Sequence, residues 1–191
     1  MVIDRRQQIV EAAAKSFALF GYKATTMEQV AKLANVGKGT IYTFFTNKEE
    51  LFQEIMNRLI QEMKNVAEEV VDPSRHFFEN LYLVLDRMLD FRENHELAVK
   101  LSMEVNELNT QMAHEGTKQI EAAIISYIQQ QVQQALDKGE IKHCNPEIAA
   151  FVILKLYIAL TIDWKKHHEP LEKSEVAELM KLYLQEGLAL D

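Results

Sequence analysis

Side chains that can donate hydrogen bonds to nucleic acid are concentrated in residues 37–48. A short helix in this stretch would turn its apolar side chains towards a core, and these are Ile41, Phe44 and Phe45. The opposite side would then carry an ammonium group, hydroxyl groups and a phenol, supplied by Lys38, Thr40, Tyr42 and Thr43. Such groups bind phosphate oxygens and the edges of bases in the major groove of DNA. The pattern therefore indicates a helix that binds DNA.

A second short helix must precede this one and position it. Thr26 is a suitable N-cap, and Gln29, three residues later, can complete a capping box. Apolar residues then recur at helical spacing, namely Val30, Leu33 and Ala34. Asn35 tolerates the left-handed conformation in which many helices end. Two short helices joined by a tight turn form a helix-turn-helix, whose second helix enters the major groove.

Longer helices are predicted on both sides of this unit. Residues 5–20 place apolar side chains on one face, and Gly21 is suited to end that helix. Asn47 and Glu50 form a cap and carboxylate pair at the start of a helix that is expected to run to about residue 71. Because that helix starts beside the helix-turn-helix and ends in the rest of the chain, it can transmit motion between these two parts.

The charge distribution supports nucleic-acid binding despite a net charge of −8. Residues 1–48 contain seven Lys or Arg and three Asp or Glu, whereas the other residues contain 14 basic and 26 acidic side chains. A basic head attracts phosphates, and an acidic remainder limits indiscriminate binding. The single cysteine, Cys144, excludes an internal disulfide and fits a reducing, cytoplasmic setting.

The rest of the 191 residues is also predicted to be helical, because Gly and Pro stand at helix boundaries and no β-type alternation competes. Asp72-Pro73 and Asn145-Pro146 are N-cap and first-turn pairs, and Ser174 is expected to cap the last helix. Asn94-His95 should end the helix that begins at Asp72-Pro73. The later helices are expected over about 96–107, over a segment that ends at Lys138 with Gly116 as a candidate bend, and over 146–166 and 174–187.

The segment 146–166 is apolar on nearly all sides, and such a helix has to be buried on all sides. One domain of this size covers one side, so a second copy of the chain is expected to cover the other. With the segment 174–187 beside it, two helices from each copy would form a four-helix dimer interface of about 1,600 Å² or more. Lys155 and Asp163 interrupt the run, which is too short and too charged to favour a membrane span.

Residues 34–51 closely resemble the TetR family of one-component transcriptional regulators. The stretch is ANVGKGTIYTFFTNKEEL, and the similarity extends upstream through Ala13, Phe17, Gly21, Tyr22, Thr25, Thr26 and Ala31. The resemblance implies an all-α, nine-helix, two-domain architecture. A three-helix DNA-binding head would cover residues 1–48, and an effector-binding and dimerisation body would cover residues 49–191. It also implies a homodimer that reads a palindromic operator.

The resemblance assigns contacts with DNA as well. Thr26 would bind a phosphate through its hydroxyl and the start of its helix, Tyr42 would contact the DNA backbone, and Lys48 would bind a phosphate. The residues at or along the groove would be Gly37, Lys38, Gly39, Thr40 and Thr43. The alternative for Tyr42 is an aromatic side chain that caps the small core of the head.

Three departures from the family pattern concern the operator sequence rather than DNA binding itself. Gly37 replaces the usual serine cap, which costs a few tenths of a kcal/mol. Phe44 stands where the family often has histidine, so one polar contact with DNA is expected to be absent. Thr43 stands where an aromatic residue is common, which favours contact with a thymine methyl group.

The candidate effector site lies among aromatic, methionine and acidic residues of the body. The expected lining residues are Phe78, Tyr82, Met88, Phe91, Met103, Glu104, Glu107, Tyr127, Phe151 and Tyr157. Pockets between helices are mostly apolar, so a fatty acyl compound or a hydrophobic drug fits this composition best. A buried carboxylate at Glu104 or Glu107 would instead favour a cationic ligand or a hydrogen-bond donor. The alternatives are ordinary core packing for the apolar residues and a solvated face for the acidic ones.

The chain lacks the patterns of an enzyme or a cofactor site, because no Gly-rich phosphate loop follows a strand and no Ser-His-Asp set can be argued. His143-Cys144 and His167-His168 flank one helix, roughly 30 Å apart at 1.5 Å per residue, so they cannot share a metal within one subunit. The sequence therefore favours a homodimeric, ligand-responsive repressor. The alternatives are a transcriptional activator or another DNA-binding regulator of the same fold, and a helical small-molecule-binding protein with a vestigial helix-turn-helix.

Overall fold

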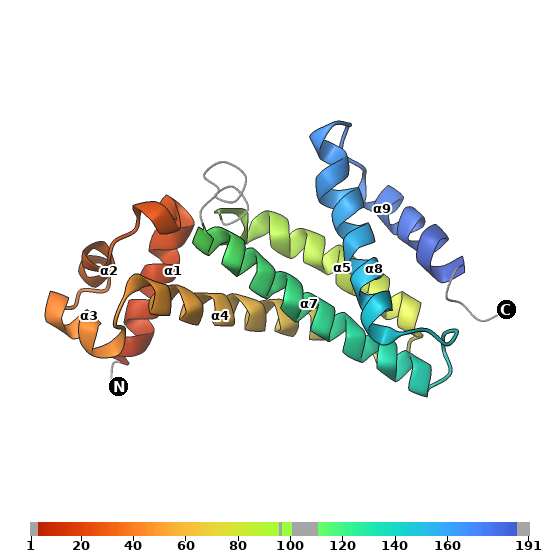
Figure 1. Ribbon diagram of the computed structural model, residues 1–191, viewed down its shortest axis with the longest axis horizontal. Coiled ribbons are helices and arrows are strands. Elements are labelled where there is room, and N and C mark those ends of the chain that lie inside the picture. Colours follow the sequence, from red (N-terminus) through yellow and green to blue (C-terminus); the bar gives the residue numbers. More distant parts are fainter. Residues whose placement is uncertain (1–3, 96, 101–110, 187–191) are drawn as a thin grey trace. The chain divides into compact units, whose positions relative to one another are not determined.

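The computed structural model describes residues 4–95, 97–100 and 111–186. Within them every regular element is helical, which confirms the predicted all-α fold (Figure 1). The α-helices are α1 (Arg5–Ala24), α2 (Met27–Leu33), α3 (Lys38–Phe44), α4 (Lys48–Glu68), α5 (Phe77–Asn94), α7 (Gln111–Asp137), α8 (Pro146–Ile158) and α9 (Lys173–Met180). Most of the helix expected over residues 96–107, and its boundary with the next helix, fall outside the described residues.

The chain packs as two compact units. The first comprises residues 1–63 and 91–120, and the second comprises residues 64–90 and 121–191. Helices α4, α5 and α7 therefore contribute residues to both units. This division by packing differs from a boundary at residue 48, and the division into a head over 1–48 and a body over 49–191 stays a prediction.

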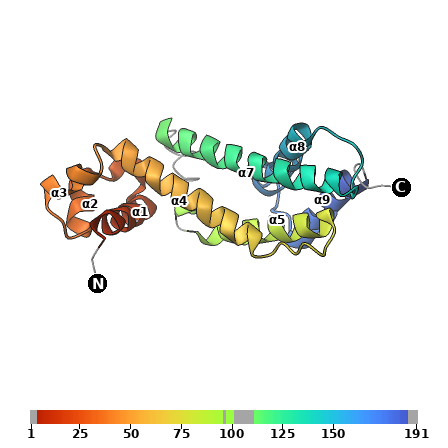
Figure 2. The same cartoon turned by 90° about the horizontal axis from the view of Figure 1, so that it is seen from below.

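The first unit has an apolar core in which α1, α2 and α3 gather around the start of α4 (Figures 1 and 2). Its largest fully buried side chains include Phe17, Ile41, Phe45, Leu51 and Phe52. Gly21 bends α1 with a φ of 82°, but the helix continues to Ala24 after the bend. Gly116 does not interrupt α7, and a Cβ there would lie 3.0 Å from Cζ of Phe52. Glycine at this position therefore allows the side chains of α4 to approach α7 closely.

The second unit has its own core between α5, the later part of α7, α8 and α9. Helix α8 begins as predicted, because Oδ1 of Asn145 accepts the N–H groups of Glu147 at 2.9 Å and Ile148 at 3.2 Å. Helices α8 and α9 pack side by side (Figure 1). No helix in the described part of the chain is both long enough and apolar enough to cross a membrane.

The predicted start of α5 at Asp72-Pro73 is wrong, because α5 begins at Phe77. Asp72 closes a local turn instead, where its Oδ1 accepts the N–H of Ser74 at 2.9 Å. The N–H of Phe77 donates to Oε2 of Glu140 at 2.7 Å, a contact across 63 residues. The helix start is therefore set partly by tertiary structure.

The last helices also differ from the prediction in detail. Helix α9 begins at Lys173 with Glu172 rather than Ser174 as its N-cap, and Oε2 of Glu175 accepts the N–H of Glu172 at 2.7 Å. The segment 146–166 is helical throughout but changes type, with a π-helix at Ala159–Asp163 and a 3-10 helix at Trp164–Lys166. A second π-helix, Lys181–Gln185, continues α9. Helix α4 ends at Glu68 rather than near residue 71.

Candidate nucleic-acid interface

Helix α2 begins with the capping box that the sequence predicts. Oγ1 of Thr26 accepts the N–H of Gln29 at 3.2 Å, and Oε1 of Gln29 accepts the N–H of Thr26 at 2.8 Å. The backbone then leaves α2 through Asn35, whose φ of 51° is the predicted left-handed exit. Because both ends of α2 are fixed by local contacts, the turn sets the orientation of α3 relative to α2.

Helix α3 starts without a side-chain cap, since Gly37 occupies the N-cap position. Gly37 has a φ of −65°, and a Cβ there would lie 3.5 Å from Oγ1 of Thr40. Neither the backbone nor the space therefore requires glycine at this position. A Cβ at Gly39 would meet nothing within 4 Å, so this part of the helix has an open face.

The exposed side of α3 carries most of the predicted DNA-binding side chains. Lys38 and Thr43 are exposed, Tyr42 is 46% exposed, and Thr40 is half-buried. The hydroxyl of Thr43 donates to the carbonyl of Thr40 at 2.7 Å. The structure thus brings these four side chains together on one short helix, while their contacts with DNA stay a prediction.

The buried face of α3 contains fewer side chains than the sequence predicts. Ile41 and Phe45 are buried, but Phe44 is 38% exposed and does not face the core as expected. Leu33, at the end of α2, is also exposed rather than part of the apolar face. Two large apolar side chains of the helix-turn-helix are therefore exposed instead of buried.

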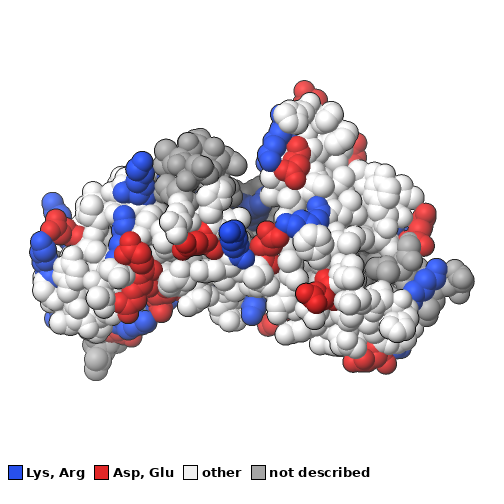
Figure 3. Space-filling view, in the orientation of Figure 1, with Lys and Arg blue, Asp and Glu red and all other residues white. Residues whose placement is uncertain are grey.

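An acidic side chain pairs with the first lysine of α3. Nζ of Lys38 donates to Oε1 of Glu28 in α2, and about two-thirds of each side chain is exposed. This hydrogen bond is the main reason that the pKa of Glu28 is lowered and the pKa of Lys38 is raised. Figure 3 shows basic and acidic groups side by side at the end of the first unit that carries α2 and α3.

Lys48, the predicted phosphate ligand, makes contacts within the protein. Its Nζ donates to the carbonyl oxygens of Tyr22 at 2.9 Å and Thr25 at 3.0 Å, and it lies 4.2 Å from the centre of the Tyr22 ring. The hydroxyl of Tyr22 donates to Oε1 of Glu49 at 2.8 Å, which lowers the pKa of Glu49. Sequence reasoning missed Glu49 and the structural role of Tyr22, because the contacts join positions more than 20 residues apart.

A guanidinium group joins the start of α1 to α4. Arg6 donates through Nη1 and Nη2 to the two carboxylate oxygens of Glu54, at 3.0 Å and 2.9 Å. This hydrogen bonding is the main cause of a lowered pKa at Glu54. The guanidinium carbon also lies 5.1 Å from the centre of the Phe45 ring, directly behind α3. Helix α3 is thus supported by α1 as well as by the apolar core.

The predicted effector residues do not form one group in the described structure. Phe78 and Tyr157 are buried in the core of the second unit, whereas Phe91 packs against the core of the first unit. Tyr82, Met88 and Tyr127 are half-buried, and Phe151 is 49% exposed on α8. Met103, Glu104 and Glu107 lie outside the described residues, so the effector site stays a prediction.

Tyr82 is the candidate effector residue with an unusual environment. Its hydroxyl oxygen is buried and has no hydrogen-bond partner among the described residues. Burial raises the pKa of Tyr82 to about 12. A buried hydroxyl without a partner costs about 1–3 kcal/mol, so this position suits a ligand that supplies an acceptor.

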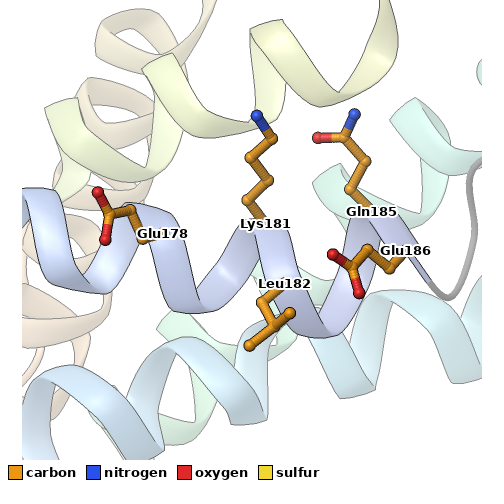
Figure 4. Close-up of a pocket in the computed structure, with 5 residues that line it drawn as sticks. All are labelled: Glu178, Lys181, Leu182, Gln185 and Glu186. Carbon is orange, nitrogen blue, oxygen red and sulfur yellow. The ribbon is translucent and has the colours of Figure 1, made fainter.

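A shallow pocket of 390 Å³ lies on the last helix instead of between the predicted lining residues (Figure 4). Its lining residues are Glu178, Lys181, Leu182, Gln185 and Glu186. All come from α9 and its π-helical continuation, and the side chains of Lys181 and Gln185 point away from that of Leu182 (Figure 4). The pocket is therefore a feature of one helix surface and not an enclosed effector site.

Large hydrophobic side chains are exposed on α8, on the 3-10 helix Trp164–Lys166 and on the π-helix that continues α9, and together they are called the apolar surface of α8 and α9. Six large hydrophobic side chains are exposed there: Ile148, Phe151, Val152, Trp164, Leu182 and Tyr183. In Figure 3, residues other than Lys, Arg, Asp and Glu (white) cover much of the α8 and α9 region, with charged groups among them. Exposed hydrophobic side chains that lie together mark an interaction site more often than a solvated face.

The fold and the arrangement of α2 and α3 define the class of helix-turn-helix DNA-binding proteins. The family model "Bacterial regulatory proteins, tetR family" matches residues 9–55. The HTH-type transcriptional regulator YhgD of Bacillus subtilis is 52% identical over 189 residues, which are 99% of both chains. The chain belongs to the tetR family and is a DNA-binding transcriptional regulator, not an enzyme.

Two further similarities are more distant. The fatty acid metabolism regulator protein of Bacillus subtilis is 29% identical over 140 residues, which are 71% of this chain and 70% of that protein. A structure of SmeT in complex with triclosan has a TM-score of 0.71 at 19% identity and covers 98% of this chain and 92% of SmeT. SmeT is described as the repressor of the Stenotrophomonas maltophilia multidrug efflux pump SmeDEF. At this identity the likeness to SmeT concerns the fold alone.

Proposed function

We propose that the chain is a homodimeric, cytoplasmic repressor that binds a palindromic operator and is released from it by a small, mainly apolar effector. The observation that carries this proposal is the exposed polar side of α3, held at its start by the capped and sharply ended helix α2. In a helix-turn-helix, this side of the second helix enters the major groove. The head would consist of residues 1–48 and the body of residues 49–191.

The proposed contacts with DNA divide into two kinds. Thr26 and Tyr42 would bind phosphates and position the head, whereas the residues at or along the groove would be Gly37, Lys38, Gly39, Thr40 and Thr43. Lys48 completes the predicted phosphate-binding set, although its ammonium group also binds two carbonyl oxygens of the head. Phe44 supplies no polar group to this surface.

The proposed dimer uses the apolar surface of α8 and α9. Two copies of this surface would bury the six exposed hydrophobic side chains against each other in a four-helix arrangement. Phe151 belongs to this surface rather than to the effector site, because half of its side chain is exposed. A dimer would place two heads on successive major-groove faces of one palindrome.

The proposed effector binds in the body, where Tyr82 offers a hydroxyl without a partner among the described residues. SmeT, which has the same fold, binds triclosan, and a curated relative regulates fatty acid metabolism. An effector can shift an equilibrium only by its differential affinity for the two states. Tenfold release from the operator therefore requires about 1.4 kcal/mol of difference.

DNA binding is tested by a palindrome selected from a random pool, with a scrambled duplex for comparison. We expect Lys38→Ala combined with Tyr42→Ala to weaken binding to the palindrome at least about tenfold while the dimer persists in analytical ultracentrifugation. Lys15→Ala in α1 changes the charge of the same unit and should have little effect. Equal affinity of the wild-type chain for both duplexes would contradict the repressor proposal.

Effector binding is tested by Tyr82→Phe, with triclosan and decanoate as probes. Removing a buried hydroxyl without a partner should stabilise the free chain by about 1 kcal/mol in chemical denaturation. The same change should weaken the binding of a probe that accepts a hydrogen bond there. A probe that binds the chain but leaves operator affinity unchanged would contradict release by that compound, and unchanged stability of Tyr82→Phe would contradict an unsatisfied hydroxyl.

A further inference from the structure

An acidic side chain of α2 lies among the groups that are proposed to face DNA. Glu28 is in the first turn of α2, two residues after the proposed phosphate ligand Thr26. Its carboxylate accepts a hydrogen bond from Nζ of Lys38, the first residue of α3. A negative charge at a surface that binds phosphates opposes binding, so electrostatics alone disfavours an acid at this position.

The fold does not depend on this ion pair. About two-thirds of each side chain is exposed, and exposed ion pairs contribute little to stability. The turn between α2 and α3 is already fixed by its backbone, because Asn35 is left-handed and the N–H of Val36 donates to the carbonyl oxygen of Ala31 at 2.9 Å. The polar groups of Glu28 and Lys38 are therefore available to a ligand.

Both members of the pair have hydrogen-bonding capacity left over. An ammonium group has three N–H donors, and Lys38 directs one of them at Oε1 of Glu28, so two remain. None of the described residues donates to the other carboxylate oxygen of Glu28, Oε2. The exposed pair thus presents two donors and one acceptor side by side.

A G·C base pair offers the matching groups in the major groove. Guanine presents two adjacent acceptors, N7 and O6, and the amino group at N4 of cytosine lies next to O6. The two remaining donors of Lys38 suit N7 and O6, and Oε2 of Glu28 suits the N4 amino group. In an A·T pair the amino group of adenine separates the two acceptors, so the ammonium group can reach only one of them.

We propose that Glu28 determines sequence specificity: together with Lys38 it reads one G·C base pair in each half of the operator, with Nζ donating to guanine and Oε2 accepting from N4 of cytosine. This inference rests on the proposed function. The carboxylate is repelled by phosphates wherever the head lies on DNA, and only opposite cytosine does it gain a hydrogen bond in return. Glu28 therefore lowers affinity in general and raises discrimination at one base pair.

Inversion of single base pairs tests this assignment. Each G·C pair of the selected palindrome is inverted in one half-site at a time, which places the carboxylate opposite O6 of guanine. We expect the wild-type chain to lose about tenfold in affinity at one position of the half-site. Glu28→Gln should lose only two- to threefold there, because an amide can either accept or donate. Glu11→Gln in α1, which removes the same charge, should keep the full wild-type loss.

The second member of the pair provides a further variant. Lys38→Met should also lose the discrimination at that position, while it weakens binding to every duplex. If Glu28→Gln instead raised affinity for the intact and all inverted duplexes by the same factor, Glu28 would only repel DNA and the proposal would be overturned. A selected half-site without a G·C pair would overturn it as well. Equal affinity of the wild-type chain for the palindrome and the scrambled duplex would defeat the proposed function and this inference together.

Discussion

The exposed side of α3 and the exposed side of α8 and α9 both carry large side chains that no described part of the chain covers, but their chemistry is opposite. On α3 the large exposed side chains include Lys38 and Tyr42, which end in polar groups. On the apolar surface of α8 and α9 they include Phe151 and Tyr183, at 49% and 60% exposure. The difference indicates a hydrated, charged partner for α3 and an apolar partner for α8 and α9.

The two surfaces also differ in how they are supported. Behind α3, an ion pair, a capping box and a lysine bound to carbonyl oxygens fix the backbone. Behind α8 and α9 lies an ordinary apolar core, with residues such as Ile153 and Met180 fully buried. A surface that reads a rigid groove requires fixed geometry, whereas two apolar helices can adjust their packing to each other.

The largest effect is expected where the apolar surface is given a charge. Phe151→Glu should dissociate the proposed dimer, because two carboxylates would be buried at the interface. A monomer holds only one head, so operator affinity should fall more than about 100-fold. Sedimentation and DNA binding would measure both changes.

Leu83→Glu is the matched control, since Leu83 is 39% exposed on α5 and lies outside the apolar surface of α8 and α9. This variant should remain a dimer. If Phe151→Glu also remained a dimer, or if Leu83→Glu dissociated it, the assignment of the interface to α8 and α9 would be wrong.

A smaller change, this time an increase in operator affinity, is expected when the acidic partner of Lys38 on α2 is neutralised. Glu28→Gln frees Lys38 from its acidic partner and removes a negative charge from the side proposed to face DNA. Operator affinity should rise about two- to fivefold, with a steeper dependence on salt. Titrations of the palindrome at several salt concentrations would detect it, and Glu11→Gln in α1 serves as a control for net charge. A loss of affinity would mean that Glu28 holds Lys38 in its binding position.

The smallest effect is a change in the stability of the chain, and it is expected from a substitution at the N-cap of α3. Gly37→Ser restores a side-chain acceptor at an N-cap where a Cβ meets no closer contact than 3.5 Å. Stability should rise by a few tenths of a kcal/mol, as measured by chemical denaturation. Gly39→Ser, inside the helix, is the comparison that adds a hydroxyl without a cap. A destabilised Gly37→Ser chain would show that the turn needs glycine for another reason.

The local chemistry of the chain predicts much of this structure. The capping box at Thr26, the left-handed exit at Asn35 and the start of α8 at Asn145 each depend on residues within four positions, and each is confirmed. The predicted start of α5 was wrong for two reasons. Asp72 accepts a hydrogen bond in a local turn, and the carboxylate of the distant Glu140 accepts the N–H of Phe77. Local signals identify caps, but tertiary contacts decide which of them a helix uses.

The candidate interface shows the same limit. Spacing placed Lys38, Tyr42 and Thr43 outside and Ile41 and Phe45 inside, in agreement with the structure. It also placed Phe44 inside, although the short helix leaves that side chain 38% exposed. The contacts of Lys48 with Tyr22 and Thr25 could not be predicted from spacing, because they depend on how α1 and α4 pack.

The π-helix at Ala159–Asp163 has a consequence for where the segment after α8 tolerates a change in length. A π-turn accommodates about one residue more than an α-turn, so deletion of one residue from this segment would restore an α-helix. The residues beyond it, Trp164 among them, would then keep their face of the helix, because the deletion removes the residue that the wider turn accommodates. A deletion of one residue within α8 itself would instead rotate Trp164 by about 100° relative to the first turn of α8, so the π-turn is the place where this segment tolerates a change in length.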